Sequence, residues 1–314
     1  GRDDVMAALK DHYKGKILLP KSFVTGNHID EVQGVYVPFW LYGARVDGEV
    51  CFDATNETVT EESDRTVTTT DHYDAYRKGN ISFERVPVDG SSKMPDGHMD
   101  AIEPFDYDAL RPFSVAYMPG YIANRYDEDC ETCKARAERR MEESTISALR
   151  ETVVDEYDDA TVENKQLDYT WEESDYALFP VWMLSTSWNG KSYLFAMNGQ
   201  TGRMVGELPC SKPKLAIASV LFFVIGFVLS QILFMGENAF DPDYLAFDVE
   251  GILINIVAPL IIVIIADVLL VGQLKTANEA IHADCYCGEL DLTEKHDTFS
   301  HTETTVVMKD NKDD

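Results

Sequence analysis

Two long apolar runs dominate the hydrophobic pattern of the chain. Residues 215–235 contain no charged side chain, and residues 251–272 form a second run that includes Asn255, Pro259 and Asp267. As a helix, each run is long enough to cross a hydrocarbon layer of about 30 Å. Two buried core helices of a soluble protein are the alternative, although adjacent runs of this length are rare in soluble folds. The pattern therefore predicts a pair of transmembrane helices.

Charges at the ends of the two runs predict their orientation. Lys212 and Lys214 precede the first run and Lys275 follows the second, whereas the acidic linker at 236–250 contains no Lys or Arg. Loops rich in Lys and Arg stay on the cytoplasmic side of a membrane. We therefore expect a multi-pass plasma-membrane protein with an external linker and both termini in the cytoplasm.

Small and polar residues inside the runs are candidates for helix packing or for function. Gly226, Ser230 and Asn255 are of the types that let transmembrane helices approach and bond. Asp267 is a candidate functional charge, because carboxylates inside a membrane are costly. It lies toward the end of the run that Lys275 follows, where it can also reach the interface.

Upstream of the runs, the pattern alternates between helix and strand. Helical composition at 4–10 and at about 129–157 precedes segments rich in aromatic and β-branched residues. Asp47-Gly48 and Asn189-Gly190 interrupt those segments, and Asp-Gly and Asn-Gly favour the tight turns of β-hairpins. The pattern predicts an α+β fold in which each helix is followed by an antiparallel meander.

The two meanders align without a gap at a spacing of 142 residues, which suggests an internal repeat. The repeat would place Pro38 with Pro180 and Trp40 with Trp182, and these four residues are its expected core. Residues 194–202, LFAMNGQTG, resemble the PepSY and cystatin-like arrangement of a helix on a sheet.

The predicted organisation is a first module (1–85), an ordered loop-rich connector (86–128), a second module (129–210), the membrane hairpin, and a polar tail (273–314) without regular structure apart from 304–308.

Charge narrows the range of partners. The 314 residues contain 27 Lys and Arg against 55 Asp and Glu, for a formal net charge of −28. Binding a nucleic-acid backbone requires clustered positive charge, so we expect no nucleic-acid partner. An acidic surface instead favours association with basic patches on a protein.

The residues with reactive side chains form no persuasive catalytic site, so we expect no enzymatic activity. Gly190-Lys191-Ser192 ends like a phosphate-binding loop but lacks the preceding Gly. Weak candidates for a zinc site or a redox pair are Cys130, Cys133, Cys285 and Cys287, and unpaired cytoplasmic thiols are the alternative. The histidines lie isolated in the sequence.

Several irregular motifs occur in one order that resembles the TFIIB-type zinc-ribbon membrane proteins of Firmicutes. They are YKGKILLPKSF (13–23), GVYVPFWL (34–41), VPVDGSSKM (86–94), IEPFDY (102–107), YMPGY (117–121) and LFAMNGQTG (194–202). Members of that family carry an N-terminal ribbon with two CxxC knuckles, and its zinc ligands map to no residue here. Because the sequence also begins without Met, we expect a chain truncated just after the ribbon, with no cofactor in this fragment.

The resemblance implies a membrane-anchored adaptor. Related zinc-ribbon proteins recruit a flotillin-like SPFH-domain protein in a membrane-stress system, so the expected partner is an SPFH-domain protein or a paralogous membrane protein, together with the lipid bilayer. One alternative is an oligomeric sensor or small-solute component that uses Asn255 and Asp267. A second alternative is a thiol-redox or hydrolytic enzyme.

Overall fold

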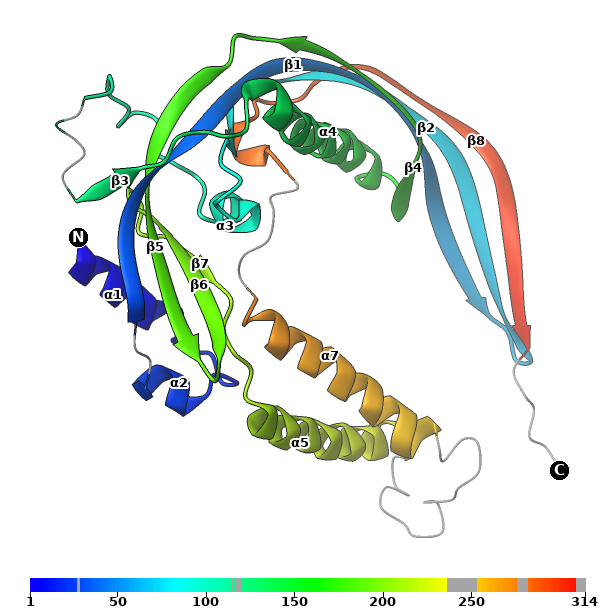
Figure 1. Ribbon diagram of the computed structural model, residues 1–314. Helices are drawn as coiled ribbons and strands as arrows, with labels where there is room; N and C mark the ends of the chain where they lie inside the picture. The colour runs from blue at the N-terminus through cyan, green and yellow to red at the C-terminus, as the bar shows by residue number, and fades with distance from the viewer. Residues whose placement is uncertain (27–28, 115, 117–119, 236–252, 276–281, 309–314) are drawn as a thin grey trace. The chain divides into compact units, whose positions relative to one another are not determined.

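The protein has a mixed α/β fold with a large antiparallel sheet and two long apolar helices near its C-terminus (Figure 1). The structure, a computed structural model, describes all residues except 27–28, 115, 117–119, 236–252, 276–281 and 309–314. The predicted fold class is confirmed at this level. The internal repeat stays a prediction.

The helices and strands alternate along the chain. The helices are α1 (Arg2–His12), α2 (Lys21–Gly26), α3 (Asp96–Ala101), α4 (Cys130–Val154), α5 (Lys212–Ser230) and α7 (Ala258–Gly272), with π-helical turns at Gln231–Met235 and Leu253–Val257 and a 3₁₀ turn at Asp284–Tyr286. The strands are β1 (Ile29–Glu61), β2 (Arg65–Asp89), β3 (Tyr121–Ala123), β4 (Asp159–Trp171), β5 (Asp175–Trp188), β6 (Lys191–Asn198), β7 (Met204–Gly206) and β8 (Asp291–Met308). The helices expected at 4–10 and 129–157 are confirmed as α1 and α4.

The strands form a sheet with the hydrogen-bonded order β7-β6-β5-β1-β2-β8, and β3 and β4 also pair with β1. The chain divides into two units that are described separately. Unit 1 comprises 1–36, 94–123 and 180–279, and unit 2 comprises 37–93, 124–179 and 280–314. Strands β1 and β5 contribute residues to both.

The core of unit 1 joins α1 and α2 to strands β5 and β6 and to the segments that flank the apolar helices. Its buried side chains are Val5, Leu9, Leu18, Leu19, Phe23, Leu184, Phe195, Met197, Leu208 and Leu274. Half-buried residues of α5 and α7, among them Leu215 and Leu270, pack against the same cluster. The apolar helices therefore share a core with the sheet.

The core of unit 2 lies between α4 and the sheet strands (Figure 1). Val50, Phe52 and Ala54 alternate along β1 and so face one side of the sheet. Leu149 and Val153 of α4 lie four residues apart and are fully buried against them. The apolar residues at every second position of β1 therefore pack on those four residues apart in α4. This packing fixes the helix on the strand.

The hairpin turn predicted at Asp47-Gly48 is wrong. Both residues lie inside β1, where Gly48 pairs with Gly79 of β2. A Cβ atom at Gly48 would lie 3.1 Å from the Cγ2 atom of Thr145 and 3.3 Å from a methyl group of Leu149. The glycine therefore allows α4 to approach the sheet closely, a role that has the same local sequence signal as a turn.

The corresponding turn at Asn189-Gly190 is confirmed. Asn189 has a φ of 50° and Gly190 a φ of 74°, and they connect β5 to β6. Positive φ at both central residues is the geometry for which Asn-Gly is favoured. The turn expected after residue 198 also exists, and the Oδ1 atom of Asn198 accepts hydrogen bonds from the backbone N–H groups of Gln200 and Thr201.

The expectation that the tail lacks regular structure outside 304–308 is also wrong. Residues 291–308 form β8, which pairs antiparallel with β2 from Arg65–Met308 to Asn80–Asp291. Nearly all of its side chains are exposed, so the strand carries no alternating apolar signal. Backbone hydrogen bonds with β2 hold the strand in the sheet, and the hydrophobic pattern of the sequence does not indicate such bonds.

The four residues expected at the core of the repeat occupy two different environments. Pro38 is buried, whereas Trp40, Pro180 and Trp182 are half-buried. The indole N–H of Trp40 donates to the backbone oxygen of Glu128, and the ring of Trp182 lies edge-on to Tyr121. Both prolines lie inside strands, Pro38 in β1 and Pro180 in β5.

Candidate functional site

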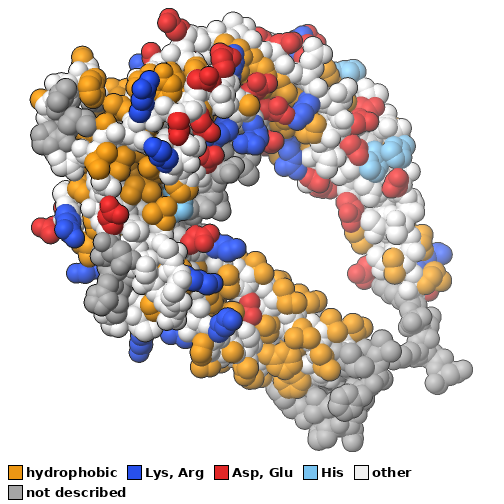
Figure 2. Space-filling view, in the orientation of Figure 1, with side chains coloured by type: hydrophobic (Ala, Val, Ile, Leu, Met, Phe, Trp, Pro, Cys, Tyr) orange, Lys and Arg blue, Asp and Glu red, His pale blue; other side chains and the backbone are white. Residues whose placement is uncertain are grey.

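The helices α5 and α7 form an antiparallel hairpin that is apolar on its outer face (Figures 1 and 2). Lys212–Leu233 and Asn255–Gly272 are each long and apolar enough to cross a membrane. Ile217 exposes 70% of its surface and Val268 exposes 66%. In water such a face would be costly, and the helices of a soluble core would bury it instead.

A close contact joins the two helices near their centres. Gly226 is buried, and a Cβ atom there would lie 3.1 Å from the Cα atom of Pro259 and 3.2 Å from a methyl group of Ile262. Ser230 is also buried, four residues later on the same face of α5, and its hydroxyl donates to the backbone oxygen of Phe227. Small residues here allow the two backbones to approach.

A polar contact lies on the Lys275 side of this crossing. The hydroxyl of Ser219 donates to Oδ2 of Asp267 over 2.7 Å, and it also bonds the oxygen of Leu215 in its own helix. Oδ1 of Asp267 is buried and has no hydrogen-bond partner among the described residues. Asp267 precedes the end of α7 at Gly272 by five residues, or about 7.5 Å of helix rise, so it lies near one end of the hairpin.

A second polar contact lies at the other end of the hairpin. The side-chain N–H of Gln231 donates to Oδ1 of Asn255, and these residues lie in the π-helical turns Gln231–Met235 and Leu253–Val257. Oε1 of Gln231 is buried and has no partner within the described part of the chain. Two polar contacts thus flank a central apolar crossing.

Backbone and lysine hydrogen bonds fix the hairpin to unit 1. The ammonium group of Lys214 donates to the backbone oxygens of Ile17 and Leu19, at 3.0 and 2.7 Å. Lys16 donates to the oxygen of Gln273 at 2.7 Å. Lys212 and Lys275, the other lysines of the predicted topology signal, are exposed.

The start of α5 and the end of α7 are also tied directly. The backbone N–H of Leu208 donates to the oxygen of Leu274, and that of Ser211 donates to Leu18, both over 2.9 Å. Cys210 lies between them, and burial together with the nearby charge of Asp267 raises the pKa of its thiol. The chain therefore enters and leaves the hairpin at one place.

The cysteine candidates do not converge. All six cysteines are free thiols. Among the residues that the structure describes, one group of at least three His, Cys, Asp or Glu side chains has its ligand atoms within 4.8 Å of one another, and it contains no cysteine. Burial raises the pKa of the Cys133 thiol to about 12 and also raises that of Cys287, which disfavours the reactive thiolate.

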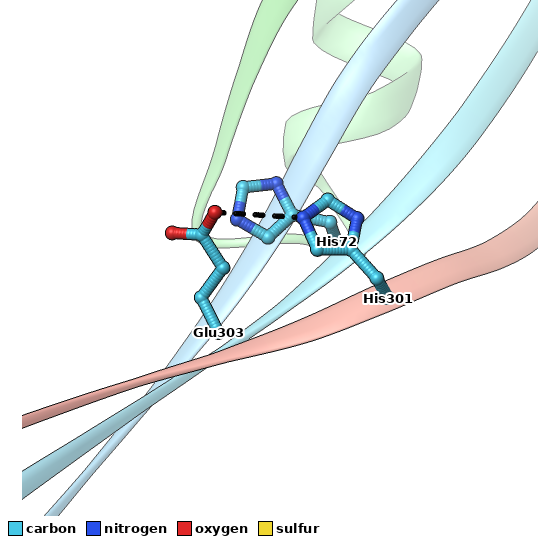
Figure 3. A group of neighbouring side chains, drawn as sticks. All are labelled: His72, His301 and Glu303. Atoms are coloured by element: carbon cyan, nitrogen blue, oxygen red, sulfur yellow. Dashed lines mark ion pairs between the residues drawn. The ribbon is translucent and has the colours of Figure 1, made fainter.

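Sequence reasoning missed the residues that complete these contacts. Ser219 and Gln231 were not singled out, although Ser219, Gly226 and Ser230 share one face of α5 at spacings of seven and four residues. Sequence reasoning also treated the histidines as isolated from one another. The group that contains no cysteine joins His72, His301 and Glu303, from strands far apart in the sequence (Figure 3).

Comparisons with known proteins give one relative. The chain is 34% identical over 215 residues to the uncharacterized protein YdjG of Bacillus subtilis (strain 168). The match covers 68% of this chain and 63% of YdjG, so this chain spans less than two thirds of its relative's length. No protein-family profile matches the chain, and no solved structure does.

Proposed function

We propose that the chain is a membrane-anchored adaptor that spans the plasma membrane twice and holds both units in the cytoplasm to bind a protein partner. The observation that carries this proposal is the shared core of unit 1. Leu208, Leu215 and Leu274 belong to one apolar cluster with α1 and the sheet. The two helices are thus packed into unit 1 and are not joined to it by a flexible linker. A partner bound to unit 1 is therefore held at a fixed distance from the bilayer.

Charge supports a protein partner with a basic surface. A net charge of −28 repels anionic lipid and nucleic acid and attracts basic patches. The zinc-ribbon resemblance suggests an SPFH-domain protein or a paralogous membrane protein in a membrane-stress response. The flanking lysines Lys212, Lys214 and Lys275 support the cytoplasmic orientation.

We expect a membrane-impermeant amine crosslinker to capture one stoichiometric partner in inside-out vesicles from the native host, and none in right-side-out vesicles. Raising the salt from about 0.1 M to about 1 M shortens the Debye length from about 10 Å to about 3 Å and should weaken the capture. Mass spectrometry of the tagged chain checks the result. No stoichiometric partner in either preparation would refute the adaptor, and capture only in right-side-out vesicles would refute its orientation.

A second candidate function is a small-solute or ion component of the membrane. It is favoured by the unpartnered Asp267 Oδ1 and Gln231 Oε1 atoms, which are buried between helices and polar enough to contact a permeating species. Two spans enclose no pathway alone, so this function requires several copies around Asn255 and Asp267.

One double variant distinguishes the two functions. An adaptor predicts that Asp267→Asn with Asn255→Ala leaves partner capture within about twofold, because both side chains bond to the neighbouring helix of the hairpin. A solute component predicts instead that the same variant abolishes cation or proton flux into reconstituted vesicles. Ser230→Ala is the matched control, because among the described residues its hydroxyl bonds to the backbone oxygen of Phe227 in its own helix.

A further inference from the structure

A cross-strand pair of histidines lies in unit 2 (Figure 3). His72 of β2 and His301 of β8 are direct partners in the antiparallel register. Their rings are parallel to within 8°, with centroids 4.5 Å apart. Directly opposite residues of neighbouring strands present their side chains on the same face of the sheet.

A bulge follows the pair. The partner of Tyr73 is Phe299, so Ser300 is the extra residue of β8 at this point. Bulges redirect side chains and recur beside functional sites. On the other side of the pair from the bulge, Glu303 lies two residues after His301 and therefore on its face of the strand, with Oε1 3.6 Å from Nε2 of His301.

In each imidazole ring, the Nδ1 atom lies close to a neighbouring oxygen. The Nδ1 atom of His72 lies 2.9 Å from Oδ1 of Asp53, and that of His301 lies 3.3 Å from the hydroxyl of Ser300. The Nε2 atoms are thus the candidate metal-binding nitrogens, and Nε2 of His301 already lies beside Glu303, the third candidate ligand. A carboxylate on the far nitrogen of a histidine fixes the ring and raises its basicity, which is the usual outer-sphere arrangement at metal sites.

We propose that His72, His301 and Glu303 bind one divalent transition-metal ion, with zinc as the expected metal. Two imidazole nitrogens and a carboxylate form a His₂Glu set, which leaves a fourth position for water. The ligand atoms lie within 4.8 Å of one another. Two ligands of a tetrahedral zinc are about 3.3 Å apart, and each imidazole binds the metal in its own plane, so binding requires the exposed His301 ring to rotate out of the stacked arrangement. An exposed His–Glu ion pair alone would account for neither the paired rings nor Asp53 behind His72.

The site would control the attachment of the C-terminal strand. The side chains of β8 are almost all exposed, so the strand is held mainly by backbone hydrogen bonds to β2. A metal that joins His72 of β2 to His301 and Glu303 of β8 adds a crosslink at the outer half of this pairing. Bound zinc should therefore slow amide exchange in 299–308 more than in 291–295.

The test is a zinc titration by calorimetry on the full chain in lipid nanodiscs. We expect His72→Ala and His301→Ala each to weaken zinc binding at least about tenfold, and Asp53→Asn to weaken it about tenfold through the ring it orients. His296→Ala is the matched control, because His296 is equally exposed on the same strand, and it should leave the affinity unchanged.

Three results would overturn the proposal. They are the absence of zinc binding, an unchanged affinity in His301→Ala, and an equal loss in His296→Ala, which would indicate adventitious binding to surface histidines. His301 is exposed, so its variant remains informative if the half-buried His72→Ala fails to fold. Hydrogen exchange in 299–308 with and without zinc is a second readout, and wild-type protein that gains no protection there would also contradict the site.

Discussion

Gly226→Leu should destabilise the membrane hairpin by about 3 kcal/mol, the upper range for overpacking a close contact. A Cβ atom alone would already lie 3.1 Å from the Cα atom of Pro259, and backbone cannot move aside as a side chain can. The added isobutyl group must push α5 away from α7. The separation would also break the hydrogen bond from Ser219 to Asp267 and leave the carboxylate unpaired between the helices.

Gly272→Leu is the control for this variant. Gly272 ends α7 and has no atom within 4 Å of the position a Cβ would take, so the substitution should be tolerated. Thermal unfolding of both variants in the same detergent measures the difference. If Gly226→Leu unfolds at the temperature of Gly272→Leu, the helices do not cross at Gly226. Gly226→Ala should give an intermediate loss, because it adds the Cβ atom alone.

Arg77→Met should cost about 3 kcal/mol and act mainly on β8, because it breaks a buried ion pair by removing one partner. Arg77 is fully buried and pairs with Asp297 of β8, whose Oδ2 atom lies 3.2 Å from one guanidinium nitrogen. The same guanidinium donates to the hydroxyl of Thr152 on α4. It thereby joins β2, β8 and α4, and the variant would leave the carboxylate of Asp297 with only the hydroxyl of Tyr157.

The pH dependence of the two proteins should have opposite signs. Burial acts to raise the pKa of Asp297, but the hydrogen bonds and charge of Arg77 outweigh it and hold the pKa below 3.8. In the wild type, the stabilisation is present above that value and is lost as the pH falls through the lowered pKa. Without Arg77, burial would be opposed only by the hydroxyl of Tyr157 and the charge of Lys295, so we expect the pKa of Asp297 to rise and acidification to recover stability.

Amide exchange of 291–308, followed between about pH 3 and pH 7 with urea unfolding, measures both effects. Lys78→Met is the control, because Lys78 and Glu49 form a partly exposed ion pair on the neighbouring position of β2. Such pairs contribute little to stability, because solvent screens their charges. Equal destabilisation by the two variants, or the same sign of pH dependence in wild type and Arg77→Met, would contradict the assignment of Arg77 as the buried anchor.

The sequence predicted those parts of the fold that have a local cause. The helices α1 and α4, the Asn189-Gly190 turn and the two apolar helices all follow from periodicity, turn chemistry or hydrophobic length. Asp47-Gly48 has the same turn signal as Asn189-Gly190, yet it lies in mid-strand because α4 packs on it. A glycine needed for close approach cannot be distinguished from a turn glycine without knowledge of the tertiary fold.

The parts that sequence reasoning missed depend on pairing between distant segments. β8 joins β2 across more than 200 residues and exposes almost all of its side chains, so no burial pattern marks it. The His72–His301 pair exists only through that register. Within the hairpin, Gly226, Asn255 and Asp267 were singled out by residue type, but their partners required the antiparallel alignment of the two helices.

The hydrogen bond between Leu208 and Leu274 has a consequence for how the chain is assembled. The backbone enters the helical hairpin after Leu208 and leaves it at Leu274, and the N–H of Leu208 lies 2.9 Å from the oxygen of Leu274. The hairpin is therefore an insertion in the chain of unit 1. The two ends of this insertion lie next to each other. Once the ends are joined, lengthening a flexible segment between them costs little further chain entropy, about 0.6 kcal/mol for each doubling of its length. The hairpin can therefore vary in length at its far end, whereas Leu215 and Leu270 are constrained because they pack in the core of unit 1.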